Sequence, residues 1–182
     1  MIRLAQVEDA PAIARVHIDT WRTTYAGIVP AEHLARLSYE RCEARWLPYL
    51  CDPQGETRTF VAEARGQVVA FASGGPARDP LPGLDGELYN LYVLEAFQGK
   101  GYGRLLVAQL AQDLAIQGYH SLIAWVVKDN PACRFYERLG GRLVGGKTVK
   151  VGGQALVDVA YGWPDLAVFG RDRAPSESSA AG

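Results

Sequence analysis

Three glycines at alternate positions, Gly99, Gly101 and Gly103, separate a stretch with strand character from a stretch with helix character. Residues 88–93 are apolar and aromatic with little charge, which is typical of a largely buried strand. Residues 104–110 repeat apolar side chains at helical spacing. A glycine-rich turn that opens a helix gathers free main-chain N–H groups and the positive end of the helix dipole at one point. The sequence therefore predicts a pyrophosphate site between a strand and a helix.

This loop differs from two common phosphate-binding loops. In a P-loop, Gly-Lys is followed by the Ser or Thr that holds magnesium, whereas Gly101 and Tyr102 follow Lys100 here. A Rossmann fingerprint has the spacing Gly-x-Gly-x-x-Gly, which these glycines do not have. The loop instead resembles the acetyl-CoA loop of the GNAT N-acetyltransferases, Gln/Arg-x-x-Gly-x-Gly/Ala, which Gln98, Gly101 and Gly103 match. A turn that only needs positive φ is the alternative interpretation.

The resemblance implies that the chain binds acetyl-CoA (coenzyme A). In that family the pyrophosphate lies on the glycine-rich loop, and the pantetheine arm pairs with the main chain where two parallel strands splay apart. The residues that the resemblance assigns to cofactor binding are Leu91, Tyr92, Val93, Gln98, Gly99, Lys100, Gly101, Tyr102, Gly103, Arg104 and Asn130.

Composition excludes several classes of protein. The chain has 182 residues, 48% of them apolar and 21% charged, which predicts one soluble globular domain. The net charge of −1 predicts no nucleic-acid partner and no membrane-surface partner. No signal core and no stretch of ~20 apolar residues is present. Three cysteines without metal-ligand spacing predict free thiols, a cytoplasmic location and no metal site.

The predicted elements follow the order strand, two helices, three strands, helix, strand, helix, two strands. This is the GNAT order, and the resemblance implies an α/β fold with a mixed central sheet of six to seven strands, splayed parallel strands 4 and 5, and about four flanking helices. We expect Asp9 to cap the first helix, and residues 74–86 to form a long loop. A single domain is predicted for residues 1–165, and a flexible tail for 166–182.

A second segment, residues 130–140, resembles the GNAT pattern Asn…Phe-Tyr-Glu-x-Leu-Gly. By that resemblance Asn130 contacts the cofactor, although Asp129 could occupy the same register. Tyr136 would protonate the departing thiolate, which suits a phenol with a pKa of about 10. The alternative for Tyr136 is a packing role beside Phe135.

Amine acetylation also needs a group that removes a proton from the ammonium. Glu87 lies at the start of the strand that precedes the glycine-rich loop, a position where many family members carry this base. An equally weighted alternative is that Glu87 anchors a neighbouring loop. By analogy with the family, the main-chain N–H groups of Val93 and Leu94 would polarise the thioester carbonyl.

The acceptor site is the least defined part of the sequence. Four aromatic residues could line it and attract a cationic amine: Trp21, Tyr25, Tyr89 and Trp125. Trp21 lies at helical spacing, where a core position is the more common reading. The predicted reaction is direct acetyl transfer to a primary amine of a small molecule or peptide. Rival predictions are a non-catalytic acyl-CoA-binding module and a longer acyl chain. The closing hairpin, through Leu156, Val157 and Val159, could form a homodimer contact.

Overall fold

The computed structural model describes residues 1–52 and 55–170 of the chain. Its centre is a seven-stranded mixed sheet with the order β1-β2-β3-β4-β5-β7-β6. All neighbouring strands are antiparallel except β4 and β5, which are parallel. The strands are β1 Ile2–Leu4, β2 Arg58–Ala64, β3 Gln67–Pro76, β4 Gly86–Val93, β5 Leu122–Val127, β6 Arg142–Val151 and β7 Gln154–Trp163.

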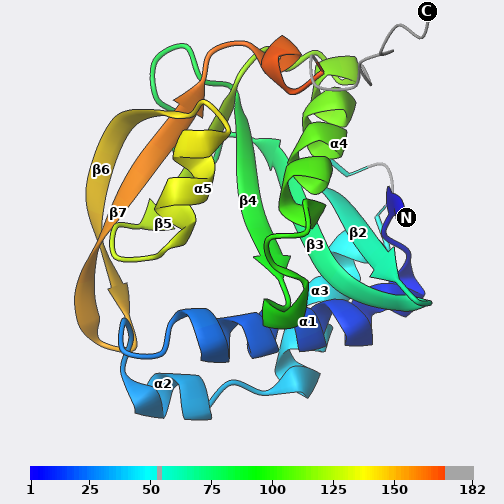
Figure 1. Cartoon of the computed structure of the whole chain (residues 1–182), viewed down its shortest axis with the longest axis vertical. Helices are drawn as coiled ribbons and strands as arrows, with labels where there is room; N and C mark the ends of the chain where they lie inside the picture. Colours follow the sequence, from blue (N-terminus) through cyan, green and yellow to red (C-terminus); the bar gives the residue numbers. More distant parts are fainter. Residues whose placement is uncertain (53–54, 171–182) are drawn as a thin grey trace, which may run out of the picture.

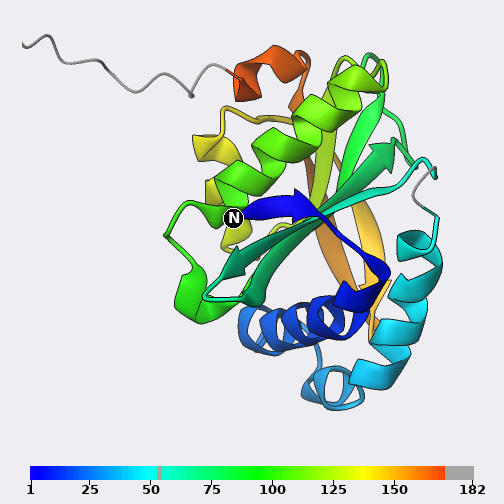
Figure 2. The ribbon, with the colours of Figure 1, turned by 90° about the vertical axis from the view of Figure 1, so that its right-hand side faces the viewer.

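Helices cover both faces of this sheet (Figure 1; Figure 2). On one face α1 packs against α3 and on β3, and on the other α4 packs on β2, β3 and β4, with α5 beside β5. The helix α2 lies near the turn of the β6–β7 hairpin, where its His33 faces Gly152. The helices are α1 Ala10–Thr24, α2 Ala31–Ala35, α3 Tyr39–Leu50, α4 Tyr102–Ile116 and α5 Ala132–Arg138, with short 3-10 turns at Val7–Asp9, Glu95–Phe97 and Leu166–Phe169.

Strand alternation divides the core into two main clusters. On β3, Ala70 and Ala72 face α4 and join a cluster with Leu106 and Leu110. The intervening Phe71 faces the opposite way and packs with α1 and α3. Because both faces are covered, these strands are almost continuously apolar, as expected for a buried sheet.

The parallel pair β4–β5 is short, and this creates the site. Pairing is confined to residues 86–88 of β4 and 122–124 of β5. Close approach at this end needs Gly86, because a Cβ there would lie 2.7 Å from the carbonyl oxygen of Ser121. Further along, the β3–β4 register shifts: Ser73 pairs with Asn90 and Gly74 with Leu88, so Tyr89 is an extra residue of β4 with no partner in β3. Such a bulge bends and twists a strand, so β4 leaves β5 beyond this point.

The predicted fold and order of strands are confirmed, including the parallel pair and the sheet of seven strands, while three helices stand between β1 and β2 where two were predicted. The second predicted helix is divided into α2 and α3, because Ser38 caps α3 by accepting from the Arg41 N–H at 3.2 Å. The prediction that the Asp9 side chain caps α1 is wrong: its carboxylate accepts two bonds from the Arg3 guanidinium, at 2.7 and 2.8 Å.

Two boundaries also differ from the sequence prediction. β3 extends to Pro76, so the long loop is confined to residues 77–85. Packed chain continues past residue 165, because Leu166 is buried beside Trp163 in the core that contains α4. Residues 171–182 of the predicted tail lie outside the described residues. Across the described ranges, no helix combines the length and hydropathy needed to cross a bilayer.

Candidate active site

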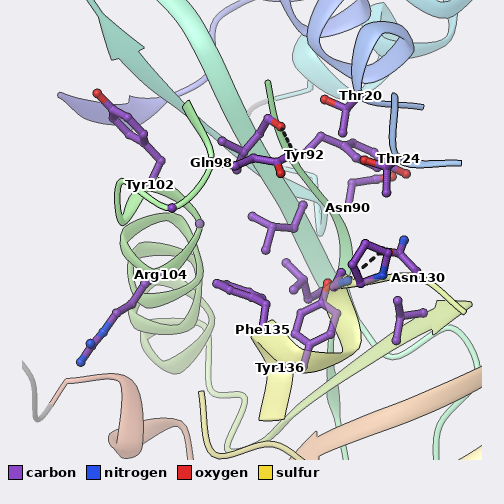
Figure 3. A pocket seen from close by; sticks show the side chains of 18 of the residues that line it. Thr20, Thr24, Asn90, Tyr92, Gln98, Tyr102, Arg104, Asn130, Phe135 and Tyr136 are labelled. Carbon is purple, nitrogen blue, oxygen red and sulfur yellow. Dashed lines mark hydrogen bonds between the residues drawn. The ribbon is translucent and has the colours of Figure 1, made fainter. Parts of the chain in front are cut away.

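A cavity of about 480 Å³ opens where β4 diverges from β5 (Figure 3). Its walls come from β4, the loop before α4, the start of α5, the middle of β5 and the C-terminal end of α1. Most of the residues predicted to form the site line it: Tyr25, Tyr89, Leu91, Tyr92, Val93, Gln98, Gly99, Gly101, Tyr102, Gly103, Arg104, Trp125, Asn130 and Tyr136. The predicted residues Trp21, Glu87 and Lys100 are not part of its lining.

The main chain of β4 offers hydrogen-bonding groups toward the gap left by β5. The Leu94 N–H donates to the Val69 carbonyl at 3.0 Å, on the β3 side. In an antiparallel pair, residues alternate between facing the partner strand and facing away, so Val93 and Leu91 direct their N–H groups toward β5. The Val93 carbonyl accepts from the Gln98 Nε2 at 3.0 Å. The predicted Leu94 donor is therefore wrong, and Val93 keeps its N–H for a ligand.

The glycine-rich loop has the backbone that an anion cradle requires. Gly99 and Gly101 have φ of +71° and +86°, a region that other residues seldom adopt. A Cβ on Gly103 would approach the Phe135 ring to 3.2 Å, so glycine lets α4 and α5 meet closely. The first N–H groups of α4 have no acceptor within the helix and carry the positive end of its dipole. These features fit a pyrophosphate.

Two basic residues of this loop lie at the rim of the cradle. Lys100 is exposed and its Nζ lies 5.2 Å from the centre of the Phe97 ring. Arg104 is also exposed, and its side chain extends away from the centre of the cavity (Figure 3). Their positive charge therefore favours an anion at the mouth of the cavity. Inside the cavity, hydrogen-bonding groups come from the main chain of β4.

Tyr136 comes from α5 and is buried, with its hydroxyl directed toward the Asn130 side of the cavity (Figure 3). Its ring packs on Phe135, Tyr161 and Trp163 at centroid distances of 5.4, 5.8 and 6.0 Å. Burial, together with the nearby Tyr25 hydroxyl, raises the pKa of Tyr136 well above its ordinary value. The phenol therefore keeps its proton at neutral pH and can donate it.

Asn130 is buried and organises the start of α5. Its Oδ1 accepts from the Ala132 N–H at 2.8 Å. Burial raises the pKa of Tyr25, and the nearby Asn130 amide partly offsets that rise. Asp129 is exposed. The geometry therefore favours Asn130 in the register of the family motif.

Glu87 is only 2% exposed, and its carboxylate binds the loop that follows β3. Its carboxylate accepts from the Arg78 N–H at 2.8 Å and forms an ion pair with the Arg78 guanidinium. That guanidinium also lies 3.9 Å from the centre of the Tyr89 ring. Since Glu87 is held in this way outside the cavity lining, the geometry favours the loop-anchor interpretation over the general base.

The side of the cavity where the acceptor is predicted to bind is aromatic, although not all four predicted residues reach it. Trp21 packs on Tyr25 at 4.5 Å and donates from Nε1 to the Tyr92 hydroxyl at 2.8 Å, so it supports the wall from behind. Tyr89 donates to the Pro76 carbonyl at 2.6 Å, and burial raises its pKa to about 12. Tyr25, Tyr89 and Trp125 contact the cavity directly.

Sequence reasoning missed several polar lining residues, among them Thr20, Thr24 and Asn90. The signals were a polar residue within an apolar strand and two threonines at i, i+4 on one helix face. Among the described residues, the buried Thr20 hydroxyl and Trp125 Nε1 lack a hydrogen-bond partner. No grouping of metal-ligand side chains occurs within residues 1–52 and 55–170.

Comparison with known proteins agrees with this geometry. Residues 17–141 match the acetyltransferase (GNAT) family. An uncharacterized N-acetyltransferase of Bacillus subtilis, YuaI, is 40% identical over 92% of this chain and 95% of its own. The L-methionine sulfoximine/L-methionine sulfone acetyltransferase of Pseudomonas aeruginosa is 29% identical over 83% of this chain and 84% of its own. The PaiA N-acetyltransferase of Thermoplasma acidophilum, solved with coenzyme A, superposes with a TM-score of 0.67 at 19% identity, covering 87% and 96% of the two chains.

Proposed function

We propose, since this chain belongs to the GNAT family of acetyltransferases, that it transfers the acetyl group of acetyl-CoA directly to a primary amine of a small molecule or peptide. That it is an acetyltransferase using acetyl-CoA follows from the family. The observation that supports direct transfer is that one cavity is lined by the gap-facing residues of β4, by Tyr136 and by the aromatic wall. Donor and acceptor could therefore bind side by side. No separate acyl-carrying site is needed in such an arrangement.

The cofactor supplies an activated thioester, and the fold supplies its binding groups. The segment from Gln98 to Arg104, which runs from the glycine-rich loop into the first turn of α4, would hold the pyrophosphate. The gap-facing main chain of Leu91 and Val93 would pair with the pantetheine arm. Because the Val93 N–H is directed into the gap, it is the donor best placed to stabilise negative charge on a carbonyl oxygen. Main-chain donors of this kind are fixed before the substrate arrives.

Tyr136 would protonate the leaving sulfur. Its raised pKa keeps the hydroxyl neutral in the resting enzyme, and its position at the cavity wall allows it to reach a reacting group. General acid catalysis of this kind contributes about 10²- to 10⁴-fold to the rate. A packing role alone would not require the hydroxyl to face the cavity.

The acceptor would enter from the side of Tyr25, Tyr89 and Trp125. Aromatic faces attract cations, so a primary amine that is protonated in solution suits this wall. The relative from Pseudomonas aeruginosa is named for amino-acid analogues, which makes L-methionine sulfone a useful test acceptor.

The cytoplasmic location and the homodimer through the β6–β7 hairpin remain proposals. On that hairpin Leu143 and Val157 are 65% and 48% exposed, which supports a contact surface. Leu156 is buried within the chain, so it cannot take part as predicted.

The test is thermal melting with and without acetyl-CoA, together with release of free thiol in the presence of amines. Acetyl-CoA at ~100 times its Kd should add about 2.7 kcal/mol of apparent stability. The amines are ethylamine, 1,4-diaminobutane, glycinamide and L-methionine sulfone. Tyr136→Phe should keep the thermal shift and lose about 10²-fold or more in kcat. A stabilised protein that releases no thiol with any amine would favour the non-catalytic module, and an unchanged melting temperature would refute the cofactor site.

A further inference from the structure

An acidic residue that sequence reasoning overlooked lies on the acceptor side of the sheet. Asp158 of β7 stands opposite Val127 of β5 and Lys147 of β6. Residues directly opposite in an antiparallel pair share a face, so Asp158 lies on the face of Val127. Val127 packs in one cluster with Tyr25, and two positions along β5 Trp125 stands opposite Ala160. Asp158 therefore lies on the sheet face that carries Trp125 and packs on Tyr25, beside these two residues of the cavity wall and not itself among the lining residues.

The carboxylate of Asp158 is half-buried and lacks an ion pair. Its cross-strand neighbour Lys147 is engaged elsewhere: the Lys147 Nζ lies 2.7 Å from the Asp79 carboxylate and 3.9 Å from the centre of the Trp125 ring. Within the described part of the chain, no hydrogen bond or ion pair reaches the Asp158 carboxylate. A half-buried, unpaired carboxylate costs stability, which is more readily explained by a role toward a ligand.

The surroundings of Asp158 connect it to the reacting groups. Burial raises the pKa of Asp158, and the Lys147 ammonium partly offsets the rise. The negative charge of Asp158 in turn raises the pKa of Tyr25, and Tyr25 raises that of Tyr136. The Lys147 ammonium on the Trp125 ring shows that this wall accommodates a cation. Among the described residues, the charged and titratable groups linked to Asp158 are Lys147 of β6, which is paired with Asp79, and Tyr25, which follows α1.

We propose that Asp158 receives the ammonium of the acceptor between Tyr25 and Trp125 and removes its proton. This inference rests on the proposed function. One N–H bond of the ammonium breaks and its electron pair stays on nitrogen as the attacking lone pair. An O–H bond forms on the Asp158 carboxylate, directly or through one water, and the proton later passes to solvent. The acceptors are therefore primary amines that are cationic at neutral pH.

The experiment compares Asp158→Asn with wild type, using the amine of the panel that wild type acetylates fastest. At pH 7 the variant should lose about 10²-fold or more in kcat/KM for the amine. Its kcat/KM should rise about tenfold per pH unit toward the pKa of the amine, because it can use only the free amine. Asp158→Glu should recover part of the activity. Glu8→Gln, which removes one negative charge from an exposed residue at the N-terminal 3-10 turn, should stay within threefold of wild type.

Two readouts besides turnover keep the inference testable. Acetyl-CoA should stabilise Asp158→Asn as much as wild type, since the carboxylate lies outside the cofactor cradle. The variant should also melt at or above the wild-type temperature at pH 7, because removing a charge that burial disfavours relieves the fold. If wild type acetylates an amine while Asp158→Asn keeps both its activity and its pH profile, the inference is overturned. If wild type itself neither binds acetyl-CoA nor acetylates an amine, the proposed function fails first.

Discussion

His17 makes a quantitative prediction about acid stability. It lies behind the cavity wall, where its ring stacks on Tyr92 at 4.7 Å and its Nδ1 accepts from the Trp46 Nε1 at 3.3 Å. Burial, and secondarily the Arg45 guanidinium, lowers the pKa of His17 from 6.5 to about 4. His17 is therefore protonated below about pH 6.5 in the unfolded chain but only below about pH 4 in the folded chain.

The sign and size follow from proton linkage. Because the unfolded state binds more protons in this window, the free energy of unfolding falls as the pH falls from 6.5 toward 4. With a pKa of 6.5 in the unfolded chain and about 4 in the folded one, the loss attributable to His17 is about 2.5 kcal/mol at pH 4.5. Stability is fully present above pH 6.5, where both states carry a neutral imidazole.

The assay is urea unfolding at pH 7.0 and pH 4.5, followed by tryptophan fluorescence, for wild type and His17→Asn. In the variant the Asn oxygen can take the place of Nδ1 as acceptor for Trp46, and the titrating group is gone. Wild type should lose about 2.5 kcal/mol more than the variant between the two pH values. Carboxylates shared by both proteins cancel in this comparison. Parallel losses, or an imidazole that titrates near pH 6.5 by NMR, would refute the reasoning.

Two further predictions concern the cradle and the loop anchor. Gly101→Ala and Gly118→Ala place a Cβ at φ of +86° and +94° at opposite ends of α4, each with nothing within 4 Å. Both should lose about 1–2 kcal/mol of stability, but only Gly101→Ala should also weaken acetyl-CoA binding, measured by calorimetry; equal affinities would contradict the cradle. Glu87→Gln should lower the free energy of unfolding by about 1–3 kcal/mol through the weakened Arg78 contact, while kcat of the folded variant falls less than tenfold. A hundredfold loss of kcat with unchanged stability would restore the general-base role to Glu87.

Features defined by neighbouring residues could be predicted from the sequence. The strand, glycine-rich loop and helix around Gly101 form within one short segment, and the pattern around Tyr136 follows directly after another strand. In both places local backbone preference and hydrophobic spacing agree with the final structure. The order of the elements and the parallel pair followed from the resemblance that these segments carry.

Features that depend on distant pairing could not be predicted. Asp9 has the sequence context of a helix cap, but Arg3, aligned on β1, competes for its carboxylate. The partner of Glu87 comes from a loop whose path is set only by the folded chain. The position of Asp158 depends on the register of a hairpin that packs beside β5, where a slip of one residue would turn its side chain to the other face.

The divergence of β4 from β5 has a consequence for how specificity can be altered in this enzyme. In the proposed complex, peptide groups of β4, which are the same whatever the side chain, recognise acetyl-CoA. The side chains of Tyr89, Asn90 and Tyr92 line the same cavity and would border the space for the amine acceptor. Alanine substitution at Tyr89, Asn90 and Tyr92 should therefore leave recognition of acetyl-CoA almost unchanged and report mainly on the acceptor. If the β4 backbone holds acetyl-CoA as proposed, acceptor preference can be redesigned on this strand without altering the donor site.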